Sequence, residues 1–104
     1  MMLLYIYIHA LTGRVFKILP LKEREDRGEE VFLADYIEGL WNDMRGAFGT
    51  FPELETIPEY VAVYNKVSFL NSEEFNIRVC RREVFSALKL LNKLEADLGG
   101  EVDV

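Results

Sequence analysis

The segment from Phe75 to Leu98 constrains the fold more than any other stretch of the chain. Its apolar residues recur every three or four positions, which places them on one face of an α-helix. These residues are Ile77, Cys80, Val84, Ala87, Leu88, Leu91, Leu94 and Leu98. The opposite face is cationic and carries Arg78, Arg82, Lys89 and Lys93. We predict a long helix that buries its apolar face and ends at Gly99-Gly100.

Two further helices are predicted in the middle of the chain. The first begins at Glu29 and reaches about Phe48, because its apolar residues again form one stripe. The members of that stripe are Leu33, Ile37, Leu40, Trp41, Met44, Ala47 and Phe48. The second begins at Pro58, a residue favoured at the first helical position, and reaches about Leu70. Asn71 or Ser72 is then expected to cap the start of the last helix.

The segment from Leu3 to Leu19 admits two interpretations. Its apolar residues step by fours and threes, which predicts a helix that stops at Pro20. The same segment is rich in Tyr, Ile, Val and Phe on both sides of Thr12-Gly13, which is typical of a β-hairpin. Gly13 costs a helix about 1 kcal/mol relative to alanine. Thr-Gly is a weak hairpin turn, however, so we favour the helix. The charged residues 21–28 then form a connector or the frayed start of the next helix.

Together these segments predict an all-α fold, a small antiparallel bundle of about four helices in a single domain of residues 1–104. The alternative is an N-terminal β-hairpin with three helices. Half of the residues are hydrophobic and seven are phenylalanine, so a core can form without disulfides or a metal. A mobile tail is expected from about residue 99.

No common catalytic or cofactor motif occurs in the sequence, so we expect a protein that is not an enzyme and binds no cofactor. The chain has one cysteine, Cys80, and one histidine, His9. Cys80 lies on the apolar face of the last helix. We therefore interpret Cys80 as a small buried hydrophobic residue rather than as a nucleophile paired with His9. His9 itself is expected in or at the rim of the core.

Asp35 and Glu38 are the best candidates for a metal site, with Asp43 on the same predicted helix. Asp35 and Glu38 are three residues apart and share a face that points away from the apolar stripe. A solvated acidic face is therefore favoured, and no metal is expected. Trp41 lies at the edge of the stripe, where it serves the core or anchors an interface.

The apolar run at the N-terminus, Met1 to Ile8, follows no basic region of the kind that secretory signals have. His9, Arg14 and Lys17 interrupt it too early for a membrane-spanning helix. A lone cysteine also fits a reducing compartment. The sequence therefore predicts a soluble cytoplasmic protein without membrane contact.

Charge is distributed unevenly within the overall net charge of −6. Residues 29–74 carry a net −8 and residues 94–104 a net −4, whereas residues 1–28 carry +2 and residues 75–93 carry +4. In one interpretation the basic face of the last helix balances the acidic middle within the molecule. In the other, the charged surface steers a partner. Direct binding of nucleic acid is not expected at this acidic pI.

Three functional hypotheses follow from these patterns. The leading one is a non-enzymatic binding protein that acts by protein–protein contact, with a homodimer suggested by the apolar first segment. The second is an acidic inhibitor of a basic, nucleic-acid-binding protein; small phage-encoded inhibitors and immunity proteins are similar in size, charge and helicity alone. The third is a metal-dependent hydrolase that uses Asp35 and Glu38. The candidate binding residues are Asp35, Glu38, Trp41, Glu53, Glu55, Glu59, Arg78 and Arg82.

Overall fold

The computed structural model describes the backbone of residues 2–102 and the side chains of residues 3–99. Its elements are α1 (Met2–Phe16), α2 (Ile18–Asp26), α3 (Leu33–Thr50), the short 3-10 helix η1 (Pro52–Thr56), α4 (Pro58–Ser72) and α5 (Ile77–Val102). No strand occurs between residues 2 and 102, so the all-α bundle is confirmed and the N-terminal hairpin is wrong. Among these described helices, none is both long enough and apolar enough to cross a membrane.

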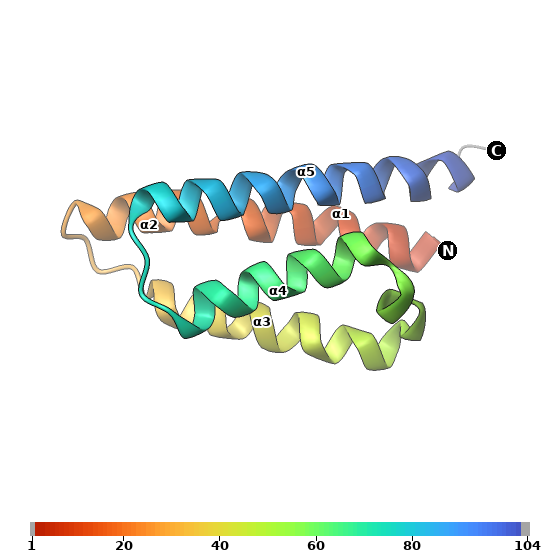
Figure 1. The fold of residues 1–104 in the computed structure, drawn as a ribbon, viewed down its shortest axis with the longest axis horizontal. Coiled ribbons are helices and arrows are strands. Elements are labelled where there is room, and N and C mark those ends of the chain that lie inside the picture. Colours follow the sequence, from red (N-terminus) through yellow and green to blue (C-terminus); the bar gives the residue numbers. More distant parts are fainter. Residues whose placement is uncertain (1, 103–104) are drawn as a thin grey trace.

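The helices run along the long axis of the molecule and form an antiparallel bundle (Figure 1). α1 and α2 make one rod that is interrupted at Lys17, and α5 runs back beside both of them. α3 and α4 form the second antiparallel pair, in which α4 also packs against α5 and α3 against α2. The molecule is elongated, with extents of 47 × 24 × 19 Å. Two connections lie at one end of the bundle, that between α2 and α3 and that between α4 and α5. η1 lies at the other end.

Pro20 explains the interruption between α1 and α2. Proline has no N–H to donate to the carbonyl of Phe16, four residues earlier, so the helix is interrupted just after that residue. Pro20 then lies in the first turn of α2, where proline is tolerated, and the chain remains helical to Asp26. The expected stop at Pro20 is thus wrong. Residues 21–26 are neither a connector nor the start of the next helix, because they continue the first rod.

The turn after α2 is a Schellman motif centred on Gly28. Gly28 has a φ of 87°, a left-handed conformation that glycine adopts without strain. Its N–H donates to the carbonyl of Glu25 at 2.9 Å, and the N–H of Glu29 donates to that of Arg24 at 3.1 Å. Glu29 is therefore part of the turn, and α3 starts at Leu33 rather than at Glu29 as predicted.

Both ends of α5 differ from the prediction. The cap at its start is Asn76, whose Oδ1 accepts the N–H of Val79 at 2.9 Å, and not Asn71 or Ser72. At the other end α5 continues through Gly99 and Gly100 to Val102. Gly99 faces the ring of Tyr5 on α1, and a Cβ there would lie 3.3 Å from that ring. Tertiary packing thus overrides the weak helix propensity of glycine. Residues 103–104 of the predicted mobile tail lie outside the described residues.

The buried residues of all the α-helices and η1 join in one apolar core. On α5 the predicted apolar face is buried at Cys80, Val84, Ala87, Leu91, Leu94 and Leu98, while Ile77 and Leu88 are half-buried. On α1 the buried residues are Leu4, Ile8, Leu11 and Val15. No charged residue is fully buried among the side chains described, so every charge in that range is available to solvent, to an ion pair or to a partner.

Candidate functional site

The outer face of α1 carries an apolar surface that the core does not cover. Leu3, Ile6 and Phe16 expose 71%, 54% and 49% of their surface. Ala10 and Gly13 are exposed between them. We call these five residues the outer stripe of α1. The helix is apolar nearly all round, and the bundle buries only its inward side, so the stripe remains in contact with solvent.

Polar contacts fix α1 on both sides of the outer stripe. Toward α3, the Arg14 guanidinium donates to Oδ2 of Asp43 at 2.8 Å. Toward α5, His9 Nδ1 lies 2.6 Å from Oε1 of Glu95, and the Thr12 hydroxyl donates to Oε2 of the same carboxylate at 3.0 Å. The stripe therefore lies on a helix whose rotation about its own axis is set by its neighbours. His9 is a rim residue, as one of the two expected placements had it.

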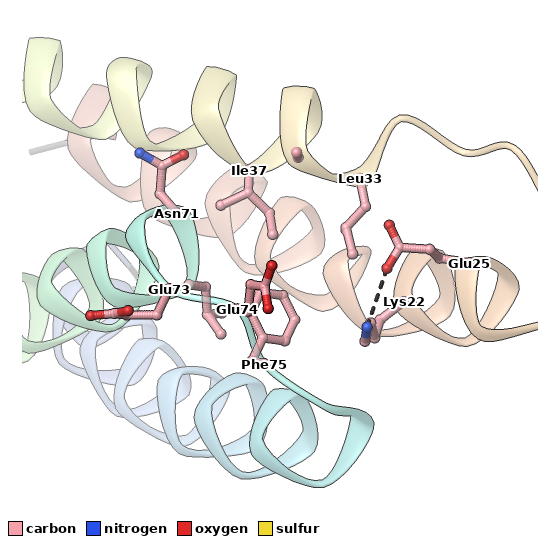
Figure 2. Close-up of a pocket in the computed structure, with 10 residues that line it drawn as sticks. Lys22, Glu25, Leu33, Ile37, Asn71, Glu73, Glu74 and Phe75 are labelled. Carbon is pink, nitrogen blue, oxygen red and sulfur yellow. Dashed lines mark hydrogen bonds and ion pairs between the residues drawn. The ribbon is translucent and has the colours of Figure 1, made fainter.

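A second feature is a hollow of about 470 Å³ at the end of the bundle where α2, α3 and the α4–α5 connection meet (Figure 2). Its floor is apolar and consists of Leu33, Ile37, Leu70 and Phe75, with Ala34 beside them. Its rim is polar and consists of Lys22, Glu25, Asn71, Glu73 and Glu74. Figure 2 shows Leu33 and Ile37 pointing from α3 into this space, with Glu74 and Phe75 lining it from the α4–α5 connection.

Lys22 is the one cation among the residues that line the hollow. Its ammonium lies 3.2 Å from Oε1 of Glu25, 3.1 Å from Oδ1 of Asp26 and 5.4 Å from the centre of the Phe75 ring. Burial alone would lower the pKa of Lys22, but the hydrogen bonds to Asp26 and Glu25 outweigh it and raise the pKa. Lys22 thus stays charged and pairs with Glu25 and Asp26 of α2. Glu73 and Glu74 form no ion pair with any residue whose side chain is described.

The carboxylates proposed for a metal site do not assemble into one. Asp35 and Glu38 are exposed on the outer face of α3, as the spacing predicted. Asp43 is engaged by Arg14 of α1. Within the described part of the chain, no three His, Cys, Asp or Glu side chains are placed to hold a metal ion. The third hypothesis therefore has no donor set to build on among these residues.

The acidic residues at the η1 end behave differently from one another. Glu53 and Glu55 are exposed on η1. Glu59, at the start of α4, binds Lys93 of α5 at 2.7 Å. That hydrogen bond lowers the pKa of Glu59 and raises the pKa of Lys93. The three glutamates are therefore not one equivalent acidic surface, because Glu59 already has a cationic partner inside the molecule.

Trp41 is half-buried between α3 and α4. Its ring stacks on Tyr64 with the centroids 6.3 Å apart, and the Arg45 guanidinium lies 4.7 Å above it. Its indole N–H is buried and finds no hydrogen-bond acceptor among the described residues. Arg78 and Arg82 are exposed in the first two turns of α5, and Arg82 binds the adjacent Glu83 at 3.1 Å. The structure does not bring these three candidates together.

Cys80 and His9 do not form a catalytic pair. Cys80 is completely buried, and burial raises the pKa of its thiol to about 11. His9 is bonded to Glu95, which lies about 22 Å further along α5 at 1.5 Å per residue. A thiolate at Cys80 would thus lack both solvent access and a base.

The hollow escaped the sequence analysis entirely. It brings together residues near positions 22, 33 and 74, which are far apart in the sequence. The outer stripe was signalled by the apolar character of the first segment. No protein-family model, no curated protein and no solved structure matches the chain.

Proposed function

We propose that the protein is a non-enzymatic binding protein that works by protein–protein contact, with the outer stripe of α1 as the contact surface and a second copy of the chain as its partner. The observation that carries this proposal is the exposure of Leu3, Ile6 and Phe16 on one helix. Covering such side chains removes apolar area from water, at about 25 cal/mol per Å². Phe32, Phe69 and Phe85 are also exposed, but each belongs to a different element.

The stripe suits a partner helix identical to itself. Its large residues lie toward the N-terminus and at Phe16, with the small residues Ala10 and Gly13 between them. A Cβ built at Gly13 would meet nothing within 4 Å, so the space in front of that residue is open. If two α1 helices cross antiparallel near Ala10, Ile6 of each copy faces Gly13 of the other. In the same register Leu3 faces Phe16, so a large side chain meets a small one near the crossing and large ones pack together at the two ends.

The charges on α1 favour the same antiparallel arrangement. α1 contains no acidic residue, its cation Arg14 lies in its C-terminal half, and Lys17 follows the helix directly. In an antiparallel pair these cations lie beside the N-terminal half of the other copy, which has no lysine or arginine. A parallel pair would instead place like charges opposite each other, which is unfavourable.

Sedimentation velocity tests the proposal. The wild-type chain should be dimeric at concentrations on the order of tens of micromolar, and Ile6→Glu should make it monomeric because a carboxylate would enter the apolar contact. Phe69→Glu is the control, since Phe69 is exposed on α4, away from α1. A wild-type monomer in this range, or equal effects of the two substitutions, would remove α1 as the contact surface.

A second candidate function is inhibition of a basic, nucleic-acid-binding protein. It is supported by four exposed carboxylates that have no ion-pair partner among the described side chains, namely Asp35, Glu38, Glu53 and Glu55. Exposed charge contacts are screened by salt. Capture of such a protein from a lysate should therefore be lost at high salt and should weaken in Glu53→Gln/Glu55→Gln. Capture that survives both changes would contradict this candidate.

A further inference from the structure

The hollow where α2, α3 and the α4–α5 connection meet combines an apolar floor with an acidic rim. Leu33 and Ile37 of α3 and Phe75 of the connection form its base, and Glu74 is at its rim (Figure 2). Its volume of about 470 Å³ lies within the range of roughly 300–1,000 Å³ that ligand sites have. An occupant that fits needs an apolar stem for the floor and a positive charge for the rim.

Lys22 already shows how such an occupant is held. Its stem lies along the wall of the hollow with only 13% of the side chain exposed. Its ammonium binds two carboxylates of α2 and lies 5.4 Å from the centre of the Phe75 ring, within reach of the ring's negative face. Lys22 leaves Glu74 without a cationic partner among the described residues. Glu74 is therefore available to pair with a cation from another molecule.

We propose that the hollow binds an arginine side chain carried by a basic segment of another protein. The three methylenes of arginine cover apolar surface while its charged end remains near water, as the open, acidic rim requires. Its planar guanidinium pairs with a carboxylate through two parallel hydrogen bonds, which suits Glu74 at the rim of the hollow. The volume also accommodates part of a neighbouring residue, which favours a protein segment over a free amine.

This site is separate from the α1 contact. The outer stripe uses α1 alone, and the hollow uses α2, α3 and the α4–α5 connection. A chain that proves monomeric would leave the proposal for the hollow unchanged. If both hold, the hollow gives the second candidate function a specific point of contact with a basic protein.

An NMR titration of the full chain provides the test. The probe is an acetylated and amidated peptide with one arginine between two leucines, and the control peptide carries neutral citrulline in place of the arginine. The arginine peptide should shift the backbone amide signals of residues 33–37 and 73–75. The citrulline peptide should bind at least about tenfold more weakly, because it loses the charge-assisted hydrogen bonds.

Matched substitutions separate local pairing from general attraction between opposite charges. Glu74→Gln should weaken binding of the arginine peptide about tenfold. Asp97→Asn removes the same charge near the C-terminal end of α5, about 30 Å along that helix from its start, and should change binding less than about twofold. Both positions are exposed, so neither substitution threatens the fold.

Four outcomes would overturn the proposal. Equal weakening by Glu74→Gln and Asp97→Asn would reduce the effect to long-range charge attraction. Equal binding of the citrulline peptide would reduce it to apolar contact. Binding of agmatine, a free guanidine, as tightly as the peptide would make this a small-molecule site. An absence of amide shifts at millimolar peptide would show that the hollow does not bind arginine.

Discussion

The hydroxyl of Tyr60 donates a hydrogen bond to the main-chain carbonyl of Met44 at 2.8 Å, and this bond ties α4 to α3 inside the core. The same hydroxyl lies 3.0 Å from that of Tyr7, so one buried oxygen links three helices. The ring of Tyr60 packs edge-on against Phe48, with the centroids 5.3 Å apart. A polar group thus lies at the centre of an apolar core without being left unsatisfied.

Tyr60→Phe should lower the free energy of unfolding by about 1–2 kcal/mol, because the ring stays while two hydrogen bonds are lost and Tyr7 loses its partner. The measurement is urea denaturation followed by circular dichroism. Tyr64→Phe is the control, since Tyr64 packs against Phe48 in the same way but makes no hydrogen bond through its hydroxyl within residues 3–99. If both substitutions cost the same, the Tyr60–Met44 bond contributes nothing specific.

Two glycines should respond to alanine with opposite signs. Gly28 has a left-handed φ of 87°, so Gly28→Ala should destabilise the fold by about 1 kcal/mol. Gly46 lies within α3, where a Cβ would meet nothing within 4 Å, so Gly46→Ala should stabilise it by about 0.5–1 kcal/mol. Thermal melts of the two variants measure both effects. A stabilising Gly28→Ala would mean that the turn after α2 does not need glycine.

The periodicity of apolar residues predicted the fold class because burial of one face is the main driving force for each helix. The pattern on α5 placed Cys80, Val84 and Leu91 in the core, where the structure has them. Element boundaries were less predictable. Pro20 was interpreted as a stop, but its position in the first turn of α2 allows the helix to resume. A local rule cannot tell these two situations apart.

Gly99 shows why the end of α5 was missed. Glycine commonly ends a helix because it tolerates left-handed backbone angles. Here its missing side chain leaves room for the ring of Tyr5, which lies 94 residues earlier in the chain. The hollow was missed for the same reason: Lys22, Leu33 and Phe75 become neighbours only when the bundle forms. The outer stripe of α1 was easier, since it depends on one helix.

The ion pair between Glu59 and Lys93 should make stability depend on pH. The hydrogen bond from Lys93 lowers the pKa of Glu59 below 4.5, so its contribution is present above pH 4.5 and is lost as pH falls through the lowered pKa. The same bond raises the pKa of Lys93 above 10.5, so that contribution is present below pH 10.5 and is lost as pH rises through the raised pKa. The pair stabilises the fold fully between these limits.

Glu59→Gln should therefore lower the melting temperature near neutral pH, and the difference from wild type should shrink below about pH 4. Glu55→Gln, on the exposed surface of η1, should leave the melting temperature near that of wild type at neutral pH. A wild-type melting temperature in Glu59→Gln at neutral pH would show that water and salt screen the pair completely.

Cys80 should be unreactive in the folded protein. Its side chain is fully buried, and burial raises the pKa of the thiol from 9.0 to about 11, so almost no thiolate is present or accessible at neutral pH. A chromogenic disulfide reagent should label the native chain only as fast as the core opens, whereas urea-unfolded chain should be labelled at once. Rapid labelling of the native chain at neutral pH would contradict the placement of Cys80 in the core. Because slow labelling reports opening of the core, Gly46→Ala should slow it further and Tyr60→Phe should accelerate it, which ties this measurement to the stabilities measured independently.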